Sequence, residues 1–244
     1  MWPKPVLAFV TVLALTAPGY VAAADEPVDL ELVLAVDISG SIDAFEARLQ
    51  RQGYMSAIVH PRVIGAIESG FLQRIAVTYF EWGGDFHQRT IVGWTVISDA
   101  ASARAFASAL AEMPIVRARR TSISAAIDYA VPLFENNGYE GTRRVIDVSG
   151  DGYNNIGRPV IEARDAAVAT GITINGLPII NDRPNPFGRP PPANLDTYYE
   201  NYVIGGPGSF LVVAVKFDNF AQAILSKLIR EIAAAAPVDV AEAD

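Results

Sequence analysis

The sequence predicts a doubly wound α/β fold, with helices on both faces of a mostly parallel, six-stranded sheet that has one antiparallel edge strand. Short apolar runs alternate along the chain with stretches of helical spacing, which is the order typical of such a sheet. Two of the runs are separated only by a short turn, which predicts a hairpin. The chain has 244 residues, 51% hydrophobic and 19% charged, enough for one packed domain.

Six apolar runs are expected to form the sheet. In chain order they are Leu30–Val36, Arg74–Phe80, Thr90–Ile97, Arg144–Val148, Ile172–Ile179 and Phe210–Val215. The segment Glu81–Asp85 joins the second run to the third and contains two consecutive glycines. This connection is too short for a crossover, so the two strands are predicted to pair antiparallel.

Helices are expected between the strands. The segments are Asp43–His60, Arg62–Glu68, Asp99–Met113, Ser122–Glu135, Pro159–Thr170 and Phe220–Ile232. Pro61 separates the first two and Pro114 ends the third, while Pro132 predicts a kink or an early end in the fourth. The segment Asn181–Asp196 holds five prolines and is therefore expected to be a loop.

The two ends of the chain differ from the middle. Residues 1–24 have the short apolar core, Val6–Ala17, and the small terminal residues of a signal peptide cleaved before Asp25. The core is short for a membrane span, although an uncleaved anchor helix is the alternative. One domain is expected over residues 25–235, followed by a flexible acidic tail, 236–244. The mature chain would then be periplasmic or secreted, without a membrane span.

Charge and cysteine content exclude several classes of function. The formal net charge is -8, from 27 acidic against 19 basic residues, whereas nucleic-acid binding usually needs a basic surface. Ordinary solubility is a sufficient explanation of this acidity. The absence of cysteine excludes a disulfide framework, a thiolate metal site and a thiol nucleophile. It also fits a bacterial periplasmic protein better than a secreted eukaryotic domain.

Oxygen-bearing side chains follow the first and fourth predicted strands. Asp37, Ser39 and Ser41 stand at alternate positions after the first, so they point the same way if the chain stays extended. Thr121 precedes a predicted helix, and Asp151 lies between two glycines after the fourth strand. Taken singly, Thr121 reads as a helix cap and Asp151 as a turn residue. Because a parallel sheet gathers its functional loops at the carboxyl ends of its strands, all five are expected to meet.

The order Asp-x-Ser-x-Ser, Thr and Asp-Gly resembles the metal-ion-dependent adhesion site (MIDAS) of the von Willebrand factor A (VWA) family. The resemblance covers Leu30 to about Ile232 and is closest to an uncharacterised group of periplasmic or secreted VWA-like proteins of proteobacteria. It implies a Rossmann-like VWA fold and a bound Mg²⁺ or Mn²⁺. By this resemblance Ser39 and Ser41 would be direct ligands, Thr121 a direct or water-mediated one, and Asp37 and Asp151 mainly water-mediated ones.

The resemblance implies a non-enzymatic, adhesion-type module of the bacterial envelope that binds a protein partner through the partner's Asp or Glu carboxylate. A vestigial site without metal, and a metal-dependent hydrolase or phosphotransfer enzyme using the same residues, are the alternatives. The sequence lacks Gly-x-Ser-x-Gly, and Ser39 and Ser41 have no base candidate nearby except Asp37. A phosphotransfer enzyme would need a second acid beside Asp37, and Ser39 occupies that position.

Three further features are expected at the rim of this site. The turn carries the aromatic residues Trp82 and Phe86, which either contact a partner or pack against the hairpin. Arg117, Arg119 and Arg120 precede Thr121 and either attract a carboxylate or form a solvated basic turn. The proline-rich loop is interpreted as facing a partner. The two histidines, His60 and His87, are too few and too separated for a zinc site.

Overall fold

The computed structural model describes residues 24–181, 184, 188, 190–215 and 219–233. The expected signal peptide, apart from Ala24, and the expected acidic tail therefore lie outside the described residues, as does part of the proline-rich loop. Within the described ranges, none of the helices combines the length and the hydrophobicity needed to cross a membrane.

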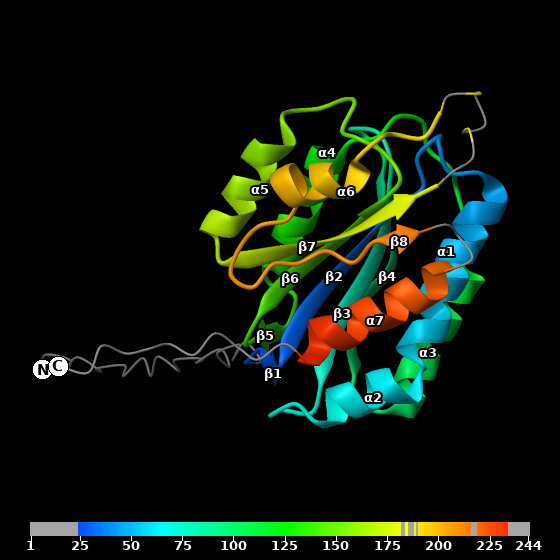
Figure 1. The fold of residues 1–244 in the computed structure, drawn as a ribbon. Helices are drawn as coiled ribbons and strands as arrows, with labels where there is room; N and C mark the ends of the chain where they lie inside the picture. Colours follow the sequence, from blue (N-terminus) through cyan, green and yellow to red (C-terminus); the bar gives the residue numbers. More distant parts are fainter. Residues whose placement is uncertain (1–23, 182–183, 185–187, 189, 216–218, 234–244) are drawn as a thin grey trace, which may run out of the picture.

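The centre of the molecule is a six-stranded sheet with the strand order β4-β3-β2-β6-β7-β8. Its strands are β2 (Leu30–Asp37), β3 (Ile75–Trp82), β4 (Gln88–Ile97), β6 (Arg144–Gly150), β7 (Ile172–Ile180) and β8 (Ala214–Val215). Only the edge strand β4 pairs antiparallel, with β3; the other pairings are parallel (Figure 1). The predicted sheet, hairpin and doubly wound α/β class are confirmed.

Helices cover both faces of this sheet, and each covering forms its own apolar core (Figure 1). One face carries α1 (Ala44–Ile58), α2 (Pro61–Glu68), α3 (Ala100–Glu112) and α7 (Phe220–Ala233); the other carries α4 (Ile123–Ala130), α5 (Val160–Ala169) and α6 (Leu195–Tyr198). Alternate residues of β2 supply the two cores, Leu32 and Leu34 to the first and Val33 and Ala35 to the second. Two-sided burial explains why this strand reads as a continuous apolar run.

Several elements differ from the prediction. Glu81 and Trp82 belong to β3 rather than to the turn. Among the described residues the last strand covers only Ala214–Val215. Before it, the backbone of Phe210 and Val212 pairs with Gly176, while the N–H of Phe210 donates to the side chain of Asn175 at 2.7 Å. As predicted, Pro132 ends α4 early: the chain tightens into a 3₁₀ turn, η1 (Val131–Phe134).

Three elements were not predicted. Two short strands, β1 (Glu26–Val28) and β5 (Tyr139–Gly141), pair in parallel as a separate small sheet. The third is α6, which continues into a π-helical turn, η2 (Tyr199–Val203).

A buried group of charged and polar side chains fixes α7 against the sheet. The ammonium group of Lys227 lies 2.9 Å from Asp147 Oδ1 on β6 and 3.0 Å from Glu231 Oε2 one helical turn further on. Asn175 of β7 donates to Glu231 Oε1 at 2.6 Å. Burial raises the pKa of Asp147 to about 7 although Lys227 opposes this shift. Because removing one member would leave an unpaired buried charge, the group determines the register of α7 on β6 and β7.

Candidate metal centre

The structure brings the five predicted site residues into one hydrogen-bonded cluster at the carboxyl ends of β2 and β6. The Oγ atoms of Ser39 and Ser41 lie 3.1 Å apart. The hydroxyl of Ser41 donates to Asp151 Oδ1 at 2.5 Å, and the hydroxyl of Thr121 donates to Ser39 Oγ at 3.3 Å. Side chains from three separate loops therefore meet, as the parallel-sheet argument predicted.

Asp37 is the last residue of β2 and is completely buried. Its Oδ1 accepts the backbone N–H of Ser39 at 2.7 Å, which turns the chain so that the two serine hydroxyls face the cluster. Its Oδ2 is buried and has no hydrogen-bond partner among the described residues. One carboxylate oxygen thus holds the turn, while the other makes no hydrogen bond within the described part of the chain.

Thr121 reaches the cluster because its loop packs closely on the β3–β4 hairpin. Gly83 accepts a hydrogen bond from the backbone N–H of Ser122 at 2.7 Å. A Cβ added at Gly83 would lie 2.2 Å from the Cβ of Ala118, so a larger residue there would push the loop away. On its other side Thr121 exchanges hydrogen bonds with Asn155, at 3.1 Å from its N–H and 2.9 Å to its carbonyl.

The site contains two buried carboxyl groups, Asp37 and Asp151, whose pKa values are both raised. Burial raises the pKa of Asp37 well above its usual range, and the negative charge of Asp151 raises it further. Burial also raises the pKa of Asp151 to about 6; the hydrogen bond from Ser41 opposes the shift and the charge of Glu46, in the first turn of α1, adds to it. Two neighbouring carboxylates in this position favour either a proton or a cation between them.

The donor set fits a small hard cation. Two carboxylates and three hydroxyls are oxygen ligands of the kind that Mg²⁺ takes, usually together with water. The unpartnered Oδ2 of Asp37 is an acceptor already turned away from solvent. Among the described residues, His, Cys, Asp and Glu alone form no group of three that could hold a metal. A cation at this site would therefore depend on the hydroxyls as much as on the carboxylates.

The rim features are only partly where they were expected. Trp82 is buried, which agrees with the packing alternative and not with a partner contact: β3 runs two residues further than predicted, and Trp82 pairs with Asp37 inside the sheet. Phe86, by contrast, is 94% exposed. Arg117, Arg119 and Arg120 are all exposed. His60 caps α2, with its Nδ1 accepting the N–H of Arg62 at 3.1 Å.

The sequence interpretation missed several residues next to the site. Phe45, in the first turn of α1, is 54% exposed, and Tyr153, two residues after Asp151, is 38% exposed. Glu46 and Tyr199 are buried. The spacing from Asp43 to Glu46 is that of a capping box, which the structure contains, and it would have placed Glu46 at the start of the helix. Tyr199 lies in the π-helical turn and had no comparable signal.

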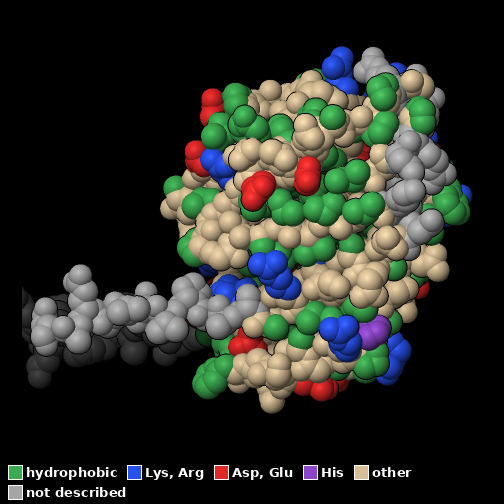
Figure 2. All heavy atoms as spheres, viewed as in Figure 1, with side chains coloured by type: hydrophobic (Ala, Val, Ile, Leu, Met, Phe, Trp, Pro, Cys, Tyr) green, Lys and Arg blue, Asp and Glu red, His purple; other side chains and the backbone are tan. Residues whose placement is uncertain are grey.

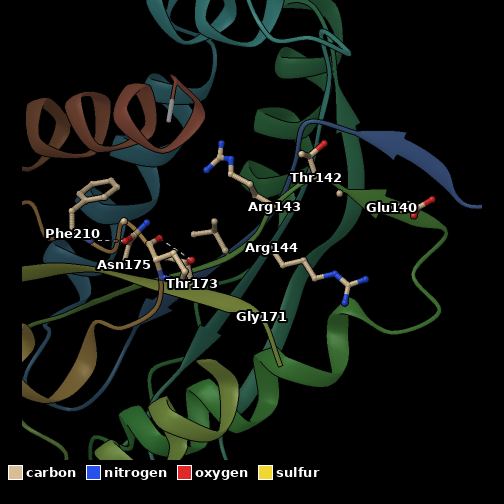
Figure 3. A pocket seen from close by; sticks show the side chains of 12 residues that line it. Glu140, Thr142, Arg143, Arg144, Gly171, Thr173, Asn175 and Phe210 are labelled. Carbon is tan, nitrogen blue, oxygen red and sulfur yellow. Dashed lines mark hydrogen bonds between the residues drawn. The ribbon is translucent and has the colours of Figure 1, made fainter. Parts of the chain in front are cut away.

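A separate cavity of about 420 Å³ lies at the other end of the sheet, beside the first residues of β6 and β7 (Figure 3). Arg143, Arg144, Thr173 and Phe210 are among its lining residues. Arg143 donates to the carbonyls of Glu231 and Ile232 at the end of α7, and Arg144 pairs with Glu31 at 3.5 Å. Both arginines therefore have partners within the fold. The lining of the cavity includes none of the five residues of the carboxylate–hydroxyl cluster.

On the face shown in Figure 2, the described Lys and Arg side chains are scattered among acidic, polar and apolar ones rather than gathered into one basic patch.

The fold is that of a VWA-type domain. It is similar to proximal thread matrix protein 1 from the mussel byssus, solved with a zinc-occupied MIDAS motif (TM-score 0.58, 13% identity, 86% of this chain and 47% of that one). It is also similar to BatB from Bacteroides thetaiotaomicron (TM-score 0.54, 24% identity, 84% of this chain and 98% of that one). A third similar structure is a von Willebrand factor type A protein from Catenulispora acidiphila (TM-score 0.56, 12% identity, 86% of this chain and 43% of that one). The chain spans about half the length of the mussel protein.

The chain itself belongs to the family described as protein of unknown function DUF1194, whose model matches residues 27–236. No curated protein matches it. The expectation of a VWA-like fold is therefore confirmed, and family membership adds no ligand or partner.

The buried carboxylates predict an unusual pH dependence of stability in the metal-free protein. Because the folded-state pKa of Asp151 is raised to about 6, the folded state binds its proton more tightly than the unfolded state does. The free energy of unfolding should therefore fall as the pH rises from about 4 to about 6. Asp151→Asn should remove the contribution of Asp151 to this fall, while those of Asp37 and Asp147 remain, and should raise the free energy of unfolding at pH 7.5 by up to about 3 kcal/mol, measured by urea denaturation in EDTA.

The control is Asp165→Asn, since Asp165 is 64% exposed on α5 and should leave the profile unchanged. A less stable Asp151→Asn variant with the wild-type pH profile would contradict the electrostatic description of the site.

Proposed function

We propose that the chain is a non-enzymatic, metal-dependent protein-binding module of the adhesion type. Asp37, Ser39, Ser41, Thr121 and Asp151 would hold Mg²⁺ or Mn²⁺. The observation that carries the proposal is the convergence of these five side chains from three loops, with Oδ2 of Asp37 buried and unpartnered. The cation would supply an open coordination position for an Asp or Glu carboxylate of a protein partner.

The arrangement explains why few charged ligands are needed. Ser39, Ser41 and Thr121 would serve as neutral hydroxyl ligands, while Asp37 and Asp151, acting mainly through water, would balance the 2+ charge. A cation bound largely by neutral oxygens keeps a strong attraction for one more carboxylate. The zinc-occupied MIDAS motif of the mussel protein supports metal binding by this fold, and oxygen ligands favour Mg²⁺ or Mn²⁺ here.

The surroundings of the cluster suit a protein partner. Exposed aromatic side chains follow two of the site segments closely, Phe45 after Ser41 and Tyr153 after Asp151, and Phe86 stands on the neighbouring hairpin. Aromatic residues of this kind are frequent anchors of protein interfaces. The exposed Arg117, Arg119 and Arg120 would attract a partner's acidic segment toward the cation.

We also propose that the module acts in the bacterial envelope, with residues 1–24 as a cleaved signal peptide and 25–235 as the domain. The short apolar core of this segment and the lack of cysteine support the proposal. The intact mass of the chain purified from a producing bacterium should correspond to a start at Asp25. A mass that still includes Met1 would refute cleavage.

Metal binding is tested by calorimetric titration of the purified domain with Mg²⁺ and Mn²⁺. The wild type should bind one ion per chain, and Asp37→Ala/Asp151→Ala should bind none, because both carboxylates that balance the charge are gone. The control is Glu112→Ala/Glu162→Ala, which removes two negative charges from exposed positions on α3 and α5. Equal binding by the site variant and the wild type would refute the assignment.

Partner binding should depend on the cation. Proteins captured by the domain from envelope extract in Mg²⁺ should be released by EDTA, since the partner's carboxylate would lose the position that binds it. The same proteins should not be captured by Asp37→Ala. Retention of the same partners in EDTA would reject the metal-bridged mode of binding even if the domain binds metal.

A further inference from the structure

Tyr199 is a buried side chain beside the site that neither the sequence motif nor the proposed ligand set includes. It opens the π-helical turn η2 and is completely buried in the core on the α4–α5 face. Its hydroxyl has no hydrogen-bond partner among the described residues. A buried, unpartnered hydroxyl is costly, and π-helical turns occur frequently at functional sites.

The hydroxyl of Tyr199 and the unpartnered oxygen of Asp37 border the same small space beside Gly150. A Cβ added at Gly150 would lie 2.8 Å from Tyr199 Oη and 2.9 Å from Asp37 Oδ2. The two oxygens are therefore neighbours across the space that this glycine leaves open. One can donate and the other can accept, and neither has a hydrogen-bond partner within the part of the chain that the structure describes.

Glycines on two neighbouring strands make this approach possible. Besides Gly150 on β6, Gly176 on β7 lies under the ring, where an added Cβ would be 2.9 Å from Tyr199 Cδ1. A side chain at either position would push the phenol away from the site. Glycine at both positions therefore leaves room for the ring of Tyr199 and for its hydroxyl on the side of Asp37.

The phenol of Tyr199 can serve as a hydrogen-bond donor, because a tyrosine hydroxyl is ordinarily protonated at neutral pH. A neutral donor beside two carboxylates reduces their mutual repulsion without contributing a charge of its own.

We infer that Tyr199 is a positioning residue of the proposed metal centre, whose hydroxyl donates to Asp37 Oδ2, directly or through one water, when the site holds its cation. Ser39 already fixes Oδ1, so Tyr199 would fix the second oxygen and with it the orientation of the whole carboxylate. Partners of this kind, one step removed from the metal, orient the ligands and affect metal affinity. The inference rests on the proposed function.

The test uses the purified chain in two measurements, calorimetric titration with Mn²⁺ and urea denaturation in EDTA. Tyr199→Phe should weaken Mn²⁺ affinity about tenfold. The same variant should be as stable as the wild type in EDTA or more stable, because the hydroxyl that is removed has no hydrogen-bond partner among the described residues. A hydroxyl with a purely structural role would give the opposite result, lower stability with little change in affinity.

The matched control is Tyr202→Phe, which removes a hydroxyl from a tyrosine that is 48% exposed in the same turn; it should match the wild type in both measurements. Wild-type Mn²⁺ affinity in Tyr199→Phe would overturn the inference and leave the proposed function intact. So would reduced affinity accompanied by reduced stability in EDTA. If the wild type itself binds no Mn²⁺, the proposed function fails and the inference with it.

Discussion

The pairing of two buried carboxylates, Asp37 and Asp151, is the constraint around which this end of the molecule is organised. The repulsion between them opposes folding, and none of the interactions that shift their pKa values comes from a basic side chain. What holds them is a set of neutral donors, the backbone N–H of Ser39 and the hydroxyl of Ser41. The surrounding glycines and asparagines keep the loops close enough for these donors to reach. The unfavourable free energy of this repulsion is offset by the apolar burial in the two cores on either side of the sheet.

The buried acids Asp147 and Glu231, unlike Asp37 and Asp151, are paired with a basic side chain. Asp147 and Glu231 share the ammonium group of Lys227, and Asn175 satisfies a further oxygen of Glu231. This group is complete within the chain, so it has a structural role in holding α7. Both groups contain buried acids, but Asp147 Oδ1 and Glu231 Oε2 lie 2.9 and 3.0 Å from the ammonium group of Lys227, whereas Asp37 Oδ2 has no hydrogen-bond partner and no basic side chain beside it among the described residues.

Much of the fold could be predicted because its signals are local. Continuous apolar runs marked the parallel strands, and the alternation of Asp37, Ser39 and Ser41 after one of them gave the first half of the site. Trp82 was misplaced because the glycines that follow it were taken as the centre of a turn that begins only at Gly83. The strand β1 has three residues and no pattern of its own. Tyr199 was missed because a π-helical turn has no characteristic periodicity, and its role depends on Gly150 and Gly176, which are distant in sequence.

The contact between Gly83 and Ala118 limits how this family of sequences can vary. Hairpin connections normally tolerate changes in length, because their tips are surrounded by solvent. Here the first residues of the connection support the loop that carries Thr121, so an added residue at Gly83 or Gly84 would displace that loop. At the tip, by contrast, Phe86 is 94% exposed. Changes in the length of this hairpin, by natural drift or in a designed library, are therefore confined to its tip. Gly83 and Gly84 fix where the connection begins.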